Sequence, residues 1–451
     1  MELSVAVEAR IAQGVIASLR AALKGIGEKE EVRLADVERA VQEAMRRAGA
    51  ACLETVVGSI GTGYVGPTRP CECGADQTTD HYAEGTWQTV LGKVTLRRAA
   101  YNCATCQTHA IPFDQQFGLA GGRTSPLLRA VLSRYCAVVP FDEACVLLAD
   151  ATGLSVSPKR AQLVSEALGR RLEQHRAAPI VERPVGGPSR LYLGIDGVFY
   201  CTTERNEANC LQWREAKVGV MFTALAPGAP KTRRISHLAP TGPPIDVADP
   251  DSHSYAVHMG NGDSFAAKLW QELVRRGIET AGEIILLSDG GEWIETVRDL
   301  ILRGLNARVI HILDLRHAQQ HLWDVARTCL GDDADGWIKD PLADLENGRV
   351  DDLLSAIQSL PTATNEAAEA IRITSAYFAK RRAMLDYPRF RSLGYQIGSG
   401  LAESACKRLV SQREKGAGMQ WTVSGAQAIA TLRAAHLCDQ WQGVIDLACA
   451  A

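Results

Sequence analysis

The sequence lacks long apolar runs and carries little net charge. No stretch approaches the ~20 apolar residues that a membrane-spanning helix requires, so we expect no membrane partner. The opening residues, MELSVAVEARIAQG, lack the basic-then-apolar pattern of a secretory signal peptide, which favours a cytoplasmic location. The formal net charge is −3, so any contact with nucleic acid must come from local basic patches rather than from the charge of the whole chain.

The composition is that of a globular chain with more than one core. It has 451 residues, of which 46% are hydrophobic and 22% are charged, and this length predicts two to four domains. Its 13 cysteines are mostly scattered among apolar neighbours, as in a reducing compartment, with one clustered exception. Residues 1–60 are predicted to be helical, because the apolar positions between 34 and 45 fall close to one face. That face packs either on its own chain or on a second copy, as a dimerisation element.

Residues 61–123 carry two cysteine pairs that flank an alternating segment. The segment TVLGKVTLRRAAYNC alternates like a β-hairpin with a turn near residues 91–93. Four thiolates close a tetrahedral structural site in zinc ribbons, so we predict zinc bound by Cys71, Cys73, Cys103 and Cys106. The first pair is tighter than the usual Cys-x-x-Cys, so His81 or His109 is an alternative ligand. The other alternative is a surface hairpin with unligated cysteines.

Residues 124–183 are predicted to form three helices of the helix-turn-helix kind. Ser157 is the expected N-cap and Pro158 the first residue of the last helix. Lys159, Arg160 and Gln162 lie at its N-terminal end, where a recognition helix contacts DNA. A three-helix unit that serves only packing is the alternative. Residues 184–189, PVGGPS, are expected to be a linker.

The segment that follows predicts a mixed sheet. RLYLGIDGVFY alternates so that Asp196 faces away from the aliphatic row. Further strands are expected at 214–225 and 232–238, then after a helix at EIILLS, and after another helix at RVIHIL. The order βββαβαβ predicts strands with helices on the faces of the sheet, and functional sites in such sheets collect at strand ends.

Three aspartates stand in or just after these strands, namely Asp196, Asp289 and Asp314. Neighbouring carboxylates repel one another unless a cation lies between them, and two Mg²⁺ ions held by carboxylates catalyse reactions of phosphodiesters. The alternative is that each aspartate is an ordinary helix cap. A further acid, Glu403, falls in the first turn of a helix predicted to begin near residue 398. Nearby cations suited to phosphate contact are Lys407, Arg408 and Arg413.

Four motifs in this order resemble those of ISKra-type insertion-sequence transposases, over about residues 70–435. Asp196 in LGIDGVFY, Asp289 in LLSDGGEWI and Glu403 in GSGLAESACK match the Asp-Asp-Glu triad. HILDLRHAQQHLW adds an Asp-x-x-His pair, Asp314 and His317, as in the wider Mutator-like group.

The resemblance implies an RNase H-like core in residues 190–317 and 396–451, interrupted by a helical insertion at 318–395. It implies two Mg²⁺ or Mn²⁺ ions on the triad, with catalytic roles for the Asp-x-x-His pair. It also implies a bacterial, nucleoid-associated enzyme that acts as a homodimer or larger homo-oligomer on double-stranded DNA. Such an enzyme binds terminal inverted repeats and target DNA, and catalyses cleavage and strand transfer.

Two other functions fit the same motifs. One is a domesticated RNase H-like nuclease that cuts DNA without joining it. The other is a non-catalytic DNA-binding protein built on the zinc-ribbon and helix-turn-helix modules. In the insertion, residues 371–391 mix cations with aromatics. These aromatics either grip unpaired bases or are buried beneath the charged side chains.

Overall fold

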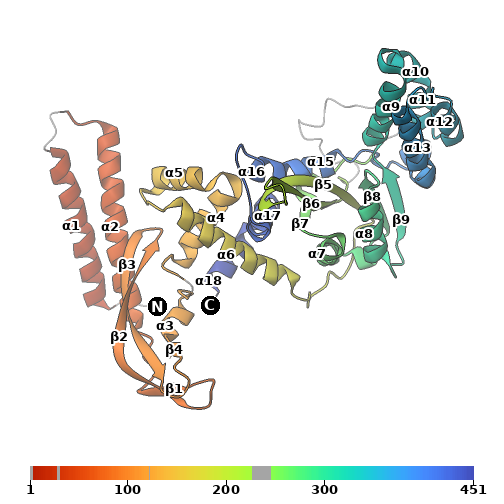
Figure 1. Cartoon of the computed structure of the whole chain (residues 1–451). Coiled ribbons are helices and arrows are strands. Elements are labelled where there is room, and N and C mark those ends of the chain that lie inside the picture. The colour runs from red at the N-terminus through yellow and green to blue at the C-terminus, as the bar shows by residue number, and fades with distance from the viewer. Residues whose placement is uncertain (1–3, 28–30, 121, 226–244, 451) are drawn as a thin grey trace. The chain divides into compact units, whose positions relative to one another are not determined.

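The computed structural model describes residues 4–27, 31–120, 122–225 and 245–450. The chain divides into two compact units, residues 1–172 with 439–451 and residues 173–438 (Figure 1). The described elements are mostly helices, together with two sheets. The architecture is therefore mixed α/β, as the sequence predicts.

The first unit begins with a helical hairpin. Helix α1 (Val5–Gly27) lies beside α2 (Leu34–Ile60) (Figure 1). One face of α2 packs on the sheet that follows, where Ala50, Leu53 and Val57 contact the sheet core. Within the described part of residues 1–60 the chain is mostly helical, as the sequence predicts, and the dimerisation role remains a prediction.

A four-stranded antiparallel sheet follows the hairpin. Its strands are β1 (Thr68–Pro70), β2 (Asp76–Thr89), β3 (Gly92–Cys103) and β4 (His109–Ala110), in that order. The β2–β3 turn uses Gly92 at φ 126°, a conformation that favours glycine. Trp87, Val94 and Leu96 form a small core with the short helix α3 (Pro112–Gln116). The hairpin predicted between the two cysteine pairs is confirmed.

Three helices complete the predicted helix-turn-helix segment. They are α4 (Pro126–Val138), α5 (Phe141–Thr152) and α6 (Pro158–Ala177). Leu128, Leu132 and Leu148 are fully buried between them. The Ser157 hydroxyl accepts from the Arg160 N–H at 3.3 Å, so the predicted cap is present. Helix α18 (Trp441–Cys449) packs on α4, which places residues 439–451 in this unit and not with the sheet domain predicted for 396–451.

The second unit is built on a five-stranded sheet in the order β7-β6-β5-β8-β9. Strands β5 (Arg190–Arg205), β6 (Leu211–Phe222) and β7 (Ser254–His258) are antiparallel neighbours. Strands β8 (Glu283–Ser288) and β9 (Arg308–Leu313) run parallel to β5. The strand predicted at 232–238 lies outside the described residues, and the third strand of the sheet is β7.

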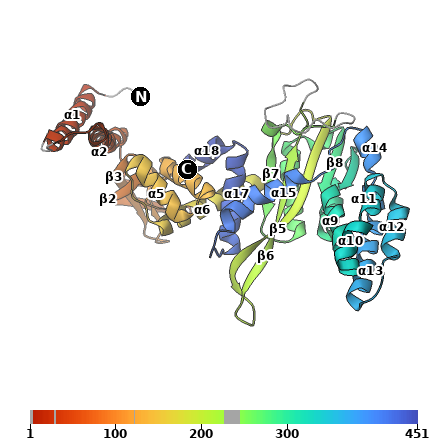
Figure 2. The same ribbon diagram turned by 90° about the horizontal axis from the view of Figure 1, so that it is seen from above.

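Helices cover both faces of this sheet. Helices α7 (Gly262–Arg275) and α8 (Glu292–Leu302) pack on the aliphatic row of β5 and β8, which includes Leu191, Leu193 and Ile284. Helix α15 (Gly400–Cys406) lies across β5 and β6 (Figure 2) and continues through a π-helical turn (Lys407–Ser411) into α16 (Gln412–Glu414). Helix α17 (Val423–Leu437) packs against β7.

The segment between β9 and α15 is helical, as predicted. It contains α9 (Leu315–Leu330), α10 (Ala334–Trp337), α11 (Lys339–Glu346), α12 (Val350–Gln358), α13 (Asn365–Lys380) and α14 (Tyr387–Ser392). In the described part of the unit, short 3-10 turns lie at Pro250–Ser252, Ile278–Thr280, Gly331–Asp333 and Arg382–Met384. Phe378, Tyr387 and Phe390 are buried, so these aromatics pack inside the insertion and do not offer a surface for bases.

Candidate functional site

The sheet register aligns three predicted aspartates across neighbouring strands. Gly194 of β5 pairs with Leu287 of β8, and Ser288 pairs with Leu313 of β9. Continuing this register places Asp196, Asp289 and Asp314 at one level, and neighbouring strands lie ~4.8 Å apart. The level is the carboxyl end of β8 and β9, where open α/β sheets place their sites.

Helix α15 lies on the same face of β5 as Asp196. A β-carbon on Gly194 would lie 3.1 Å from Cβ of Ala402, so the strand and the helix are in close contact there. Asp196 is two residues further along β5 and therefore shares the face of Gly194. Glu403 follows Ala402 directly and is exposed, while Cys406 is buried one turn on. The fold thus brings the third predicted acid to the side of the sheet that carries Asp196.

The surroundings of Asp196 make its charge costly. Burial raises the pKa of Asp196, and the neighbouring carboxylate of Asp289 raises it further. The N–H of Gly197, which donates to Asp196 Oδ1 at 2.7 Å, acts in the opposite direction, as do the Cys406 thiol and His317. Two carboxylates that repel each other in a partly buried site fit a divalent cation, which would remove the repulsion.

The loop after β8 is held from the helical insertion. Asp289 Oδ1 accepts from the Gly291 N–H at 2.9 Å, and the Asp289 carbonyl accepts from the Tyr377 hydroxyl at 2.8 Å. Arg381 is only 6% exposed, and its Nε donates to the Gly290 carbonyl at 2.9 Å. Its guanidinium also lies over the Tyr377 ring. The end of α13 therefore fixes the backbone directly after the Asp289 side chain.

Asp314 acts as a helix cap. It is 5% exposed, and Oδ1 accepts from the His317 N–H at 2.6 Å at the start of α9. Oδ2 accepts from the backbone N–H of Ser399, just before α15. Both oxygens are engaged by backbone donors, which matches the capping alternative that the sequence left open.

His317 belongs to an aromatic group beside the aspartates. Its ring centroid lies 4.8 Å from that of His321, and the His321 ring lies 4.1 Å from that of Tyr377. His317 is close enough to Asp196 to lower the pKa of that carboxyl. His321, Arg381 and Cys406 were not predicted as site residues. For His321 the signal in the sequence was its i, i+4 spacing from His317, and for Cys406 it was the i, i+3 spacing from Glu403.

The carboxylates of Asp196, Asp289 and Glu403 do not form a tight set of metal ligands in the described structure. Among the described residues, one group alone has three or more metal-ligating atoms within 4.8 Å of one another, and it contains neither aspartates nor Glu403. Of the cations predicted nearby, Lys407 is exposed, whereas Nη1 of the half-buried Arg408 lies 3.4 Å from the Tyr255 hydroxyl. Arg413 is 1% exposed and its guanidinium lies over Trp421. Arg413 is thus a core residue, which corrects its assignment to DNA contact.

The tight ligand set is formed by Cys71, Cys73, Cys103 and Cys106. The Sγ atoms of Cys71 and Cys106 are 3.5 Å apart, and those of Cys73 and Cys103 are 3.6 Å apart. A tetrahedron with Zn–S bonds of about 2.3 Å has edges of about 3.8 Å, so these separations fit zinc. The backbone N–H of Cys73 is the largest influence lowering the pKa of Cys71, to about 6, which favours the thiolate that a metal needs. Neither His81 nor His109 belongs to the group.

The residues predicted to contact DNA on α6 are at the surface end of that helix. Lys159 is exposed, and its Nζ donates to Gln162 Oε1 at 3.3 Å. Gln162 in turn donates to Glu166 at 2.8 Å, and Arg160 Nε donates to the Thr124 hydroxyl at 3.0 Å. Lys159 and Arg160 line a shared recess, whereas Gln162 is held along the helix.

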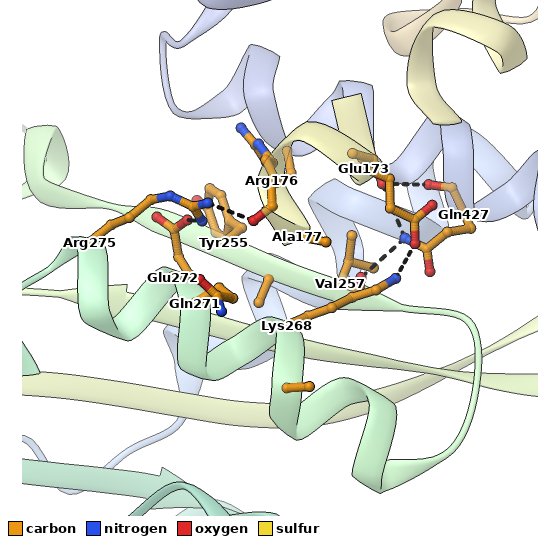
Figure 3. A pocket seen from close by; sticks show the side chains of 14 residues that line it. Glu173, Arg176, Ala177, Tyr255, Val257, Lys268, Gln271, Glu272, Arg275 and Gln427 are labelled. Atoms are coloured by element: carbon orange, nitrogen blue, oxygen red, sulfur yellow. Dashed lines mark hydrogen bonds and ion pairs between the residues drawn. The ribbon is translucent and has the colours of Figure 1, made fainter. Parts of the chain in front are cut away.

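A cavity of about 170 Å³ lies between the end of α6, β7, α7 and α17 (Figure 3). Its charged side chains satisfy one another: Lys268 pairs with Glu173, and Arg275 pairs with Glu272 at 3.3 Å. Gln427 donates to the Val257 carbonyl at 3.2 Å. The Lys268–Glu173 pair holds the end of α6 on α7, and Gln427 holds α17 on the edge strand β7, so the cavity is accounted for by packing.

No protein-family model matches this chain, and no curated protein sequence matches it. One solved structure, described as the "Drosophila P element transposase strand transfer complex", aligns at 9% identity with a TM-score of 0.23. The alignment covers 69% of this chain and 80% of that one. Across the described residues, no helix is both long and apolar enough to cross a membrane.

Proposed function

We propose that the protein is a DNA transposase of the Asp-Asp-Glu type, with an RNase H-like core in its second unit. The observation that carries the proposal is the level row of aspartates, in which the charge of Asp289 acts on Asp196. Helix α15 supports it further, because Ala402, the residue before Glu403, contacts the strand that carries Asp196. The antiparallel β5–β6–β7 meander followed by two parallel strands agrees with the βββαβαβ order of such a core.

Asp196, Asp289 and Glu403 would hold two Mg²⁺ or Mn²⁺ ions, which supply an activated nucleophile and a stabilised leaving oxygen. The rest of the site positions these acids. Arg381 and Tyr377 fix the backbone around Asp289, and Asp314 ties the start of α9 to the start of α15. His317 borders Asp196, where its imidazole would contact DNA near the scissile phosphate. Lys407, directly after α15, is exposed, and its ammonium group would face a DNA phosphate.

The first unit would supply DNA recognition. The four-cysteine group would bind structural zinc, and α6 would dock on double-stranded DNA at the terminal inverted repeats. In a bacterial cell this activity belongs on the nucleoid. Assembly of two or more copies on DNA, with the α1–α2 hairpin as the contact between copies, completes the proposal.

The test is divalent-ion-dependent nicking of duplex DNA that carries the sequences flanking the gene. Asp289→Asn is expected to reduce nicking by at least a hundredfold, because it removes one charged ligand and leaves the shape intact. Asp263→Asn, at an exposed position in the first turn of α7, is the matched control and should nick as the wild type does. Unchanged nicking by Asp289→Asn would refute the site.

Nicking alone does not separate a transposase from a nuclease. A second assay therefore supplies pre-cut ends with free 3′-hydroxyl groups and a target plasmid. Joined products that disappear in Glu403→Gln support the transposase, whereas cutting without any joining assigns the protein to the nuclease class.

A further inference from the structure

One recess in the first unit is lined by cations. A cavity of about 600 Å³ runs along one face of α6 and is bordered by the segment before α4, by α4 itself and by Ala448 of α18. Its charged lining residues are Arg123, Arg129, Lys159, Arg160 and Arg171, with no aspartate or glutamate among the lining residues. Five like charges around one cavity are unfavourable unless an anion joins them.

The recess follows a continuous stripe of α6. Arg160, Val164, Ala167 and Arg171 recur at helical spacing on the lining face. From Arg160 to Arg171 the helix rises about 16 Å, at 1.5 Å per residue. Phosphates follow at about 3.4 Å of axis per strand in duplex DNA, so a recess of this length spans several of them. The side chains between its cationic ends are apolar, which suits the sugar edge of a backbone.

The cations are held by neutral groups. Arg129 Nε donates to the Thr124 carbonyl at 2.9 Å and Arg160 Nε to the Thr124 hydroxyl at 3.0 Å, so both guanidinium groups converge on one residue. Arg171 donates to the Ala450 carbonyl at 2.9 Å. In the described part of the chain, none of the five cations lies within 4.0 Å of a carboxylate.

Burial and repulsion from a neighbouring cation both affect the charge of Arg129. Burial lowers the pKa of Arg129, and the nearby charge of Arg171 lowers it further. Arg170, the adjacent residue on α6, lies outside the recess and pairs with Glu166 at 3.6 Å. Neighbouring arginines on one helix therefore have opposite environments, one compensated by an acid and one left facing other cations.

We propose that this recess binds the phosphate backbone of duplex DNA, with Arg129 and Arg171 adding contacts beyond the exposed end of α6. The proposal rests on the DNA-binding part of the proposed function and names where the backbone lies. It gives α6 two roles along its length. The N-terminal end faces the groove, and the Arg160-to-Arg171 stripe follows the strand beside it.

The experiment compares Arg171→Gln with Arg170→Gln in the full-length, zinc-loaded protein. Binding to a fluorescent duplex is measured by anisotropy over a series of salt concentrations. Loss of one phosphate contact lowers the slope of log affinity against log salt by about 0.9. Arg171→Gln is expected to show this change with about threefold weaker binding near 0.1 M salt, whereas Arg170→Gln keeps the wild-type slope. Circular dichroism melting checks that both variants fold.

Equal slopes for all three proteins, or equal losses in both variants, would overturn the proposal. Inorganic phosphate is the second probe. If millimolar phosphate raises the melting temperature of the wild type but not of Arg171→Gln, while DNA binding is the same in both, the recess serves a free anion and the DNA assignment is wrong. A changed slope in Arg171→Gln together with no nicking by the wild type would refute the catalytic proposal and leave the proposed role of the recess intact.

Discussion

Replacing Arg381 by methionine tests how the helical insertion supports the loop that carries Asp289. The guanidinium of Arg381 donates through both Nε and Nη2 to the Gly290 carbonyl, and through Nη1 to the Tyr377 carbonyl at 3.1 Å. Hydrogen bonds from a charged donor contribute ~1.5–3 kcal/mol each. Two of these bonds share an acceptor, so we expect a total loss of about 3–5 kcal/mol, including the cost of leaving the Gly290 carbonyl buried without a donor.

Arg382→Met is the matched control. Arg382 forms a bidentate pair with Asp351, but the two side chains are 50% and 84% exposed, so solvent screens the pair and its loss should hardly change stability. In urea, with a slope of about 3 kcal/mol per molar, Arg381→Met should unfold about 1 M or more below the wild type and Arg382→Met within about 0.3 M of it. Equal midpoint shifts in the two variants would show that Arg381 does not hold this loop.

Three further predictions concern zinc, a glycine and a histidine. Cys103→Ser is expected to reduce bound zinc from about one equivalent to far below it and to lower the melting temperature of the β2–β3 module. Cys210→Ser, which changes an exposed thiol outside the four-cysteine group, should retain the metal. Elemental analysis and melting curves measure the two effects. Gly290→Ala should destabilise the protein more than Gly304→Ala does. Both glycines have positive φ, but only at Gly290 would a β-carbon clash with Arg381, at 2.4 Å from its Nε. Equal urea midpoints for the two variants would rule out this clash. Burial, followed by the charge of Arg298, lowers the pKa of His311 to about 3, so the unfolded chain takes up a proton there that the folded chain excludes. The stability from this neutral imidazole is complete above pH ~6.5 and is lost as the pH falls toward 3. Between pH 7.5 and 4.5 the wild type should lose more stability than His311→Gln, and parallel curves would contradict this.

Patterns local to one strand or helix predicted much of the fold. Alternation in RLYLGIDGVFY placed Asp196 opposite the aliphatic row, and the hairpin between the cysteine pairs followed from its turn glycine. Strand β7 was missed because SYAVH is a five-residue edge strand without a long alternating pattern. Short edge strands are defined by their partner more than by their own sequence.

The site could be predicted only up to the point where distant segments meet. Arg413 was assigned to DNA contact because of its charge. The buried stripe through Ala402, Cys406 and Val410 continues to Arg413 at helical spacing, and this stripe was the better signal. The convergence of Arg129 and Arg171 joins two helices that are far apart in the chain, and no periodicity within either helix reports it. The same holds for Arg381, whose acceptor follows a strand that lies about ninety residues earlier in the sequence.

The double use of Asp314 bears on how this protein could change in evolution. The Asp314 carboxylate accepts hydrogen bonds from backbone N–H groups at both ends of the segment that leaves the sheet after β9 and returns before α15. Leu315 N–H also donates directly to the Ile397 carbonyl at 3.3 Å. The two ends therefore meet whatever the length of the polypeptide between them. The helices nearest these two ends form one closed junction with the sheet, whereas α10, α11 and α12 lie between them in the sequence and carry none of these hydrogen bonds.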